Sequence, residues 1–291
     1  MSNKKIILIT GAHGQVGLQC IESMSQGREF EPLSYPHKEF DICDRSSIEK
    51  IFRKDFSAVI NCAAYTAVDM AQTETEKAWA SNALAPKLLS IACASKEVPL
   101  IHFSTDYVYD NGLYTPLKES DPCNPKSIYA ISKYIGEQEA LYYHDSTLII
   151  RTSWVYSRNG QNFVNTIRKL ASERDVLNIV HDQIGAPTYT PDLVGSILQI
   201  LYGILQGSGD KNSFGIYNYS NSGAISWYEF AQEILRFSPH KCQLIPVPTT
   251  SFPRPAHRPA FSVFDLSKIQ NSFGTITRPW QEALADCLQK D

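Results

Sequence analysis

The chain has 291 residues, of which 43% are apolar and 20% are charged, and its formal net charge is −3. This is the composition of an ordinary globular protein, long enough for one large domain or two coupled ones. The charge is close to neutral and no run of lysines or arginines occurs, which argues against a nucleic-acid partner. No apolar stretch approaches the ~18 residues needed to cross a bilayer, so we expect no membrane partner.

The seven cysteines lie at positions 20, 43, 62, 93, 123, 242 and 287. Their number is odd and none forms a C-x-x-C pair, so a disulfide framework and a zinc site both lack the required spacing. We expect free thiols and a reducing, cytoplasmic environment.

The chain opens with a short apolar run at residues 4–10 that has no periodicity, the pattern of a strand buried on both faces. Gly11, Gly14 and Gly17 follow directly. Their spacing allows a tight turn, close approach of a pyrophosphate, and close packing of the next helix, whose free N–H groups face the phosphates. The segment predicts a dinucleotide-binding loop, whereas the glycines alone would also fit a flexible turn.

Strands and helices alternate through the rest of the first half. The expected strands are 30–35, 57–63, 99–104 and 147–152, and the expected helices are one from about 14, 46–54, 73–96 and one around Tyr129. This alternation predicts parallel strands with right-handed crossovers, hence a doubly wound α/β sheet. Ligands bind beyond the carboxyl ends of such strands, where Gly11, Thr66, Thr105 and Trp154 all fall.

The second half has a more mixed pattern. Helices are expected at 161–174, 192–206 and 226–237, the last with Ser226 as its N-cap, and a strand is expected at 215–220. Five prolines between 246 and 259 predict a passage without regular structure. We interpret this part of the chain as a small lobe that closes over the rim of the sheet.

Tyr129 and Lys133 stand four residues apart in a segment expected to be helical. Their side chains then share one face, with Cβ atoms ~5–6 Å apart. A lysine ammonium at that place favours the phenolate and lowers the tyrosine pKa, so that the phenol can exchange a proton with a carbonyl or alcohol oxygen near neutral pH. The spacing alone also fits a tyrosine at the edge of a core beside a solvated lysine.

Together these features resemble the extended short-chain dehydrogenase/reductase superfamily and, within it, the dTDP-4-dehydrorhamnose reductase family. The resemblance runs along nearly the whole chain in the family's order, in the blocks Gly11–Gly17, Asn61–Asp69, Ser104–Asp110, Tyr129–Glu137, Arg151–Tyr156, Asp182–Thr188 and Arg258–Ser262. Each block is common alone, but the ordered set is specific. It implies an NAD(P)-binding Rossmann domain at 1–156, with further core elements around 160–200. Residues 157–291 are then mainly a substrate-binding lobe interleaved with that domain.

The resemblance also implies roles for individual residues. Tyr129 would be the general acid, Lys133 would lower its pKa and bind the nicotinamide ribose, and Thr105 would hydrogen-bond the reacting oxygen. The implied cofactor contacts are Gly11, Gly14, Gln15, Val16, Gly17, Asp41, Ile42, Ala64, Tyr65, Thr66, Tyr129 and Lys133. The implied substrate contacts are Thr105, Asp106, Trp154 and Arg258.

Four of these residues also have plainer interpretations. Thr105 could be a turn cap, and Asp41 a solvated acid that begins a short helix. Trp154 could be core packing, and Arg258 could brace the proline-rich lobe.

The chain departs from the family at several positions. His13 stands where threonine is common, and Ser127 and Ala130 flank Tyr129 where asparagine and glycine are usual. Some family members dimerise around a magnesium ion held by three glutamates. The matching positions here are Gln19, Pro191 and Lys290, which cannot replace such a carboxylate set. We therefore predict no structural metal, and a monomer or weak homodimer.

The expected cofactor is NADPH, with NADH as the alternative. An acid at the end of the second strand would hold the adenosine 2′-hydroxyl, but Ser34 is neutral there, and His37 and Lys38 lie just beyond. The resemblance implies reduction of the 4-keto group of a nucleotide sugar, dTDP-4-dehydro-6-deoxy-L-mannose, to give dTDP-L-rhamnose. Two alternatives stay open: a reductase of another nucleotide-linked 4-keto-6-deoxy sugar, and a non-catalytic NADP-binding regulatory subunit similar to the methionine adenosyltransferase beta subunit.

Overall fold

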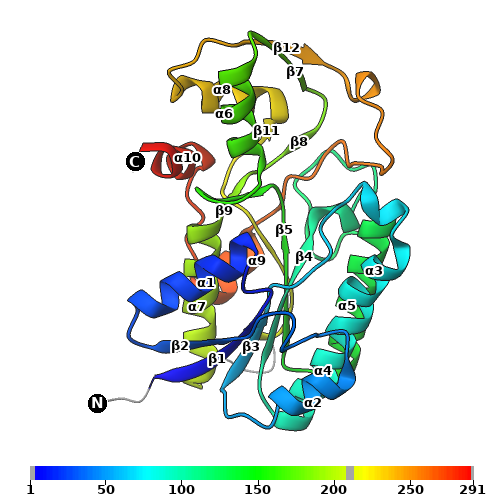
Figure 1. The fold of residues 1–291 in the computed structure, drawn as a ribbon, viewed down its shortest axis with the longest axis vertical. Helices are drawn as coiled ribbons and strands as arrows, with labels where there is room; N and C mark the ends of the chain where they lie inside the picture. The colour runs from blue at the N-terminus through cyan, green and yellow to red at the C-terminus, as the bar shows by residue number, and fades with distance from the viewer. Residues whose placement is uncertain (1–3, 208–212, 290–291) are drawn as a thin grey trace.

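A six-stranded parallel sheet forms the centre of the computed structural model, which describes residues 4–207 and 213–289 (Figure 1). The strand order is β10-β5-β4-β3-β1-β2. The strands are β1 (Lys5–Thr10), β2 (Phe30–Ser34), β3 (Ala58–Asn61), β4 (Leu100–Thr105), β5 (Thr147–Thr152) and β10 (Gly215–Tyr219). The predicted doubly wound α/β sheet is confirmed.

Helices cover both faces of this sheet (Figure 1). On one face lie α1 (Gln15–Gln26), α7 (Thr190–Leu205) and α9 (Ser267–Phe273), and on the other lie α2 (Arg45–Ile51), α3 (Thr75–Trp79), α4 (Ala85–Lys96) and α5 (Ile128–Tyr143). The sequence of β1 is continuously apolar because both of its faces are buried under helices. Ile7 and Ile9 pack in the core under α1 and α7, while Leu8 packs in the core under α2 and α4, because successive side chains point to opposite faces.

The helix expected over residues 73–96 is divided in the structure. A 3-10 turn η1 (Met70–Gln72) and α3 lead into a π-helical turn η2 (Ala80–Leu84), which continues as α4. Asn82 is fully buried in that π turn. Single π turns inside helices often occur at functional sites.

A smaller lobe lies beyond the carboxyl ends of β4 and β5, at the top of Figure 1. Its helices are α6 (Phe163–Glu173), α8 (Trp227–Arg236) and α10 (Trp280–Gln289), and it also contains a 3-10 turn η5 (Thr249–Ser251). Its short strands pair as β6 (Val155–Tyr156) with β9 (Thr188–Tyr189), β7 (Val176–Val180) with β12 (Gln243–Val247), and β8 (Ile184–Gly185) with β11 (Ile225–Ser226). The lobe has its own apolar core around Phe230. Ser226 is the N-cap of α8, as expected, and it also forms a capping box with Glu229.

One expectation for the lobe is wrong. Residues 246–259 were expected to contain no regular element, but Pro246 lies inside β12. The N–H groups of alternate residues in a strand point to opposite sides, and Gln243 donates its N–H to Asp175 O of the neighbouring segment at 2.8 Å. The nitrogen of Pro246 therefore faces away from β7, on the open edge of a two-stranded sheet where proline is tolerated.

Within the described residues, no helix combines the length and apolar character needed to span a membrane. The same residues contain no group of three His, Cys, Asp or Glu side chains placed to hold a metal ion. Lys290, one of the positions compared with a magnesium site, lies outside the described residues.

Candidate active site

The glycine loop connects β1 to α1 and leaves no room for side chains at two positions. Gly11 has a φ of +63°, and a Cβ there would lie 2.5 Å from the backbone nitrogen of Ala63. A Cβ on Gly17 would lie 2.3 Å from the carbonyl oxygen of Gly11. Gly14 is the N-cap of α1, and no side chain caps the first turn. The exposed N–H groups at this helix start, in Gln15 and its neighbours, fit the pyrophosphate of a dinucleotide.

The side chain of Gln15 fastens this helix start to the segment that precedes α6. Its Oε1 accepts hydrogen bonds from Ser157 Oγ at 2.8 Å and from Asn162 Nδ2 at 2.9 Å. The backbone of Gln15 and Val16, rather than the glutamine side chain, is thus the part available to a ligand.

Asp41 and Ile42 lie between β2 and α2. Asp41 Oδ1 accepts from the N–H of Cys43 at 2.9 Å, so its carboxylate shapes the loop. Ile42 is buried in the core on the α2 side. The N-cap of α2 is Asp44, which accepts from Ser46 N, so the interpretation of Asp41 as the residue that begins this helix is wrong.

Ala64, Tyr65 and Thr66 follow β3, and Asn82 fixes the backbone of Tyr65. Asn82 Oδ1 accepts from Tyr65 N at 2.8 Å, and Asn82 Nδ2 donates to Tyr65 O at 3.0 Å. The same amide donates to Ser132 Oγ on α5 at 3.2 Å. Asn82 is not among the site residues predicted from the sequence, where the available signal was an asparagine within an otherwise helical apolar pattern.

Tyr129 lies in the first turn of α5, where Ser127 is the N-cap and accepts from Ala130 N at 3.2 Å. The two departures from the family beside Tyr129 are therefore compatible with a well-formed helix start. Burial raises the pKa of Tyr129 to about 12, a hydrogen bond with Thr105 opposes this, and the Asp106 carboxylate raises it further. The expected lowering of the phenol pKa by Lys133 is not found. A neutral phenol at pH 7 still has the proton that a general acid must donate.

Lys133 is helical and four residues beyond Tyr129, as expected, but its ammonium is directed at β4. Its Nζ donates to Phe103 O at 2.6 Å and lies 3.4 Å from His102 Nε2. The side chain is 3% exposed, and burial lowers the Lys133 pKa to about 8, with Glu137 acting in the opposite direction. These contacts explain why the tyrosine gains little from this positive charge.

Thr105 ends β4 and serves two purposes. It caps the 3-10 turn η3 (Asp106–Val108) by accepting from Tyr107 N at 3.3 Å, so the plainer interpretation as a turn cap is correct. Its hydroxyl also donates to Asp106 Oδ1 at 3.1 Å and contacts Tyr129. Burial raises the pKa of Asp106 to about 6, although hydrogen bonds with Ser262 and Thr105 lower it.

Trp154 follows β5 in a strained conformation, with a φ of +47°. Its ring stacks on Trp227 of α8, with centroids 3.4 Å apart. Gly185 is also so close to the ring that a Cβ there would lie 2.6 Å from the indole. Strain of this kind costs about 1–3 kcal/mol and persists where the surroundings hold it, often at ligand sites.

Arg258 is fully engaged by Asp69, in the segment after β3. Its two terminal nitrogens donate to the Asp69 carboxylate at 3.0 and 2.8 Å. Hydrogen bonding from Arg258 is the main cause that lowers the pKa of Asp69. The interpretation of Arg258 as a brace therefore matches its contacts in this structure, and it ties the lobe to the sheet.

A pocket of about 970 Å³ opens on the lobe, and Tyr107, after β4, is its lining residue from the rim of the sheet. Its lining includes Tyr107, Arg258, Gln183, Trp227 and Ile179. The ring of Tyr107 packs edge-on against Tyr129, with centroids 5.6 Å apart, so the pocket ends next to the candidate acid. Of the predicted catalytic and substrate residues, Arg258 lines this pocket, whereas Thr105, Asp106, Tyr129, Lys133 and Trp154 do not.

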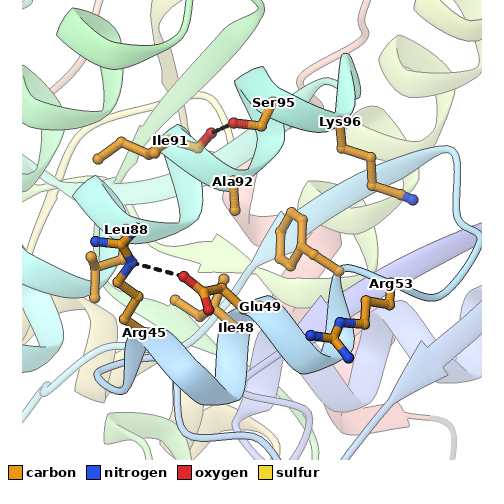
Figure 2. Close-up of a pocket in the computed structure, with 10 residues that line it drawn as sticks. Arg45, Ile48, Glu49, Arg53, Leu88, Ile91, Ala92, Ser95 and Lys96 are labelled. Carbon is orange, nitrogen blue, oxygen red and sulfur yellow. Dashed lines mark hydrogen bonds and ion pairs between the residues drawn. The ribbon is translucent and has the colours of Figure 1, made fainter.

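A second pocket of about 450 Å³ lies between α2 and α4 (Figure 2). Its lining includes Leu88 and Ile91 of α4, Arg45 and Glu49 of α2, and Lys96 at the end of α4. None of the predicted site residues lines this pocket.

A model of the RmlD substrate binding domain family matches residues 4–291. Over 285 residues the chain is 36% identical to the dTDP-4-dehydrorhamnose reductase of Aggregatibacter actinomycetemcomitans, with 96% of each chain covered. It is also 36% identical to the spore coat polysaccharide biosynthesis protein SpsK of Bacillus subtilis, covering 98% of this chain and 97% of that one. The crystal structure of dTDP-4-dehydrorhamnose reductase from Bacillus anthracis in complex with NADP superposes with a TM-score of 0.91 at 33% identity, covering 99% of this chain and 100% of that one.

Proposed function

The chain belongs to the dTDP-4-dehydrorhamnose reductase family, and from that membership we propose that it reduces the 4-keto group of dTDP-4-dehydro-6-deoxy-L-mannose to give dTDP-L-rhamnose. The observation that carries this proposal is the full-length family match together with Thr105, Tyr129 and Lys133 at one rim of the sheet. The large pocket that ends at Tyr107 supplies space for a nucleotide sugar. The product would serve the synthesis of cell-surface polysaccharide.

NADPH is the proposed cofactor, with NADH as the alternative, and it would supply the hydride when bound. Gly11, Gly14 and Gly17 leave the space for its pyrophosphate, and the first turn of α1 offers N–H donors to it. Ser34 ends β2 without a negative charge, and His37 and Lys38 are exposed beyond it, which favours a 2′-phosphate. Comparing kcat/KM for NADPH and NADH tests this preference.

The proton would come from Tyr129, which burial keeps neutral at physiological pH. Thr105 contacts the phenol and would hydrogen-bond the same substrate oxygen, holding it near the donor. Asp106, Trp154 and Arg258 are proposed to contact the substrate at the pocket's edge. For Arg258 this requires the guanidinium to share or exchange its partner Asp69.

We propose a division of labour between the two parts of the chain. Residues 1–156, with core elements around 160–200, would bind the cofactor, while 157–291 would mainly bind the sugar nucleotide. Strand β10 pairs with β5 in the central sheet, which supports the interleaving of the two parts. All seven cysteines are free thiols, which suits the cytoplasm, and we propose a monomer or weak homodimer there.

The decisive experiment is a product assay with the keto sugar prepared from dTDP-glucose by the preceding enzymes. We expect NADPH consumption and dTDP-L-rhamnose as product, and Tyr129→Phe is expected to reduce kcat by 10²–10⁴-fold. Tyr142→Phe is the matched control, because Tyr142 lies on the same helix with 81% of its surface exposed. Unchanged turnover by Tyr129→Phe would remove it as the proton donor. Binding of NADP without turnover of any keto sugar would instead support a regulatory subunit.

A further inference from the structure

A row of buried polar side chains crosses the carboxyl half of the central sheet. Thr10, Asn61 and His102 stand side by side on β1, β3 and β4, since Thr10 pairs with Asn61 and Asn61 pairs with His102 in the strand register. Lys133 of α5 ends the row at His102. All four residues are at most 3% exposed. Buried polar groups of this kind are stable only when their donors and acceptors match.

The backbone fixes the orientation of the Asn61 amide. The N–H of Ala63 points at Asn61 Oδ1 at 3.2 Å, and a backbone N–H can only donate, so this atom must be the oxygen. Thr10 Oγ1 also donates to it. The amino group of Asn61 consequently faces Nδ1 of His102, at 2.8 Å.

This contact determines which nitrogen of His102 carries the proton. An amino group donates, so Nδ1 must accept and cannot carry hydrogen. Burial, and then the charge of Lys133, hold the pKa of His102 well below its usual value, so the ring is neutral. A neutral ring without hydrogen on Nδ1 carries it on Nε2, the atom 3.4 Å from Lys133 Nζ.

We propose that His102 is a positioning residue of the reductase, which presents its Nε2–H to Lys133 and thereby favours the neutral amine of that lysine over the ammonium. A neutral amine has a lone pair that can accept a hydrogen bond from Nε2–H. An ammonium has none, so two N–H donors would face each other without an acceptor. The proposal rests on the proposed function only in taking Lys133 to be catalytic.

A lysine that can become a neutral amine would help Tyr129 to regain its proton after each turnover. After Tyr129 has given its proton to the substrate oxygen, its phenolate must regain one before the next cycle. Lys133 can release a proton towards the site and become an amine, which the Nε2–H of His102 stabilises. The amine then takes up a proton from solvent and returns to the ammonium. Lys133 has a pKa of about 8, close enough to neutrality for both forms to be accessible.

Two charged groups near this turn of α5 are already in ion pairs. Glu137, one turn along the helix, forms an ion pair with Arg151 of β5 at 2.6 Å. On α4, Lys87 pairs with Glu139 at 2.9 Å. The titratable groups on the remaining elements packed against α5 are Glu76 and Lys77 of α3, Asp106 and Tyr107 of η3, and His102 of β4. Of these, His102 is the group that contacts Lys133 Nζ directly.

Nuclear magnetic resonance tests the proposal without any turnover. Long-range ¹H–¹⁵N spectra distinguish the two neutral tautomers of a histidine, and we expect His102 to remain in the Nε2–H form from pH 5 to pH 9. The ¹³Cε signal of Lys133, assigned by its absence in Lys133→Met, is expected to titrate with a pKa near 8. An Nδ1–H tautomer, or a Lys133 titration at the ordinary value of about 10.4, would overturn the proposal.

Two variants of the row sharpen the test. His102→Gln offers Lys133 a carbonyl oxygen that accepts from the ammonium, and should raise the Lys133 pKa by about one unit, a tenfold shift of its proton equilibrium. Asn61→Asp serves if His102→Gln does not fold: its carboxylate draws the ring proton to Nδ1, frees Nε2 to accept, and raises the Lys133 pKa as well. An unchanged Lys133 titration in the folded variant would contradict the proposal.

His144→Gln is the matched control. His144 is also buried, and its Nε2 contacts Val98 O at 2.9 Å, but it lies eleven residues beyond Lys133, roughly 16 Å along the helix. It should leave the Lys133 titration unchanged even if it lowers stability. If the protein turns over substrate, the pKa of the alkaline limb of its kcat/KM–pH profile should rise in His102→Gln and stay unchanged in His144→Gln. If the unsubstituted protein turns over no keto sugar but Lys133 titrates near 8 and His102 keeps the Nε2–H form, the reductase function is refuted and this inference stands.

Discussion

The sheet domain and the lobe hold their charged groups in different ways. In the sheet domain, Arg151 of β5 and Glu137 of α5 form an ion pair with both side chains at most 1% exposed. Between the sheet and the lobe, Arg258 and Asp69 form an equally well-aligned pair whose side chains are 22% and 27% exposed. A buried pair cannot be broken without stranding a charge in the core, whereas the partly exposed pair can exchange partners with water or a ligand. The sheet therefore provides a fixed rim, and the lobe provides contacts that a substrate can replace.

The largest expected effect is that of Arg151→Met, which removes one partner of the buried ion pair. The change leaves the Glu137 carboxylate buried without its partner, and the free energy of unfolding should fall by about 3–5 kcal/mol. Arg45→Met is the control, since the Arg45–Glu49 pair on α2 is exposed and should contribute at most about 1 kcal/mol. Urea unfolding of both variants measures the difference. Equal losses would mean that burial does not separate the two kinds of pair.

The next largest expected effect is the dependence of stability on the ionisation of Asp106. Burial raises its pKa from 3.8 to about 6, so the folded protein binds a proton more tightly than the unfolded chain does. The contribution of Asp106 to stability is therefore greatest below pH 4 and is lost as the pH rises through 6, an effect of about 3 kcal/mol. Asp106→Asn removes the ionisation, and should flatten the dependence while reducing kcat/KM. Thermal unfolding between pH 4.5 and pH 8 tests this, and an unchanged slope would contradict it.

The contribution of Asp69 to stability should depend on pH in the opposite direction and be smaller. Hydrogen bonding from Arg258 lowers the pKa of Asp69, so its contribution to stability is present above the usual carboxylate value and is lost as the pH falls. Asp69→Asn should cost about 1 kcal/mol at pH 7, and less at high salt, because the pair is partly exposed. Unfolding at low and high ionic strength checks both statements. A loss that does not depend on salt would indicate packing instead of charge.

The sequence predicts features that depend on a local pattern, and it does not predict features that depend on which strands pair. Apolar runs such as Ile7 to Ile9 reveal a doubly buried strand without knowledge of its neighbours, and the strand ends then place the site residues on one rim. The role of His102 depends on the register that sets it beside Asn61 and on an amide whose orientation Ala63 fixes. No one-dimensional pattern contains those pairings, although a lone histidine in an apolar strand was a signal.

The smallest expected effect concerns Pro246 in the lobe, which lies in β12 although its proline-rich segment predicted no regular element. Gln243 N donates to Asp175 O and His181 N donates to Val247 O, so the odd-numbered residues of β12 bond to β7 and Pro246 faces outward. Pro246→Val should consequently change the free energy of unfolding by no more than about 0.5 kcal/mol. Ile245→Pro, one residue earlier, removes an inward N–H and leaves a β7 carbonyl without its donor, which should cost about 1–3 kcal/mol. Thermal unfolding of the two variants decides the matter, because similar losses would show that proline is disfavoured along the whole strand and not only where it faces β7.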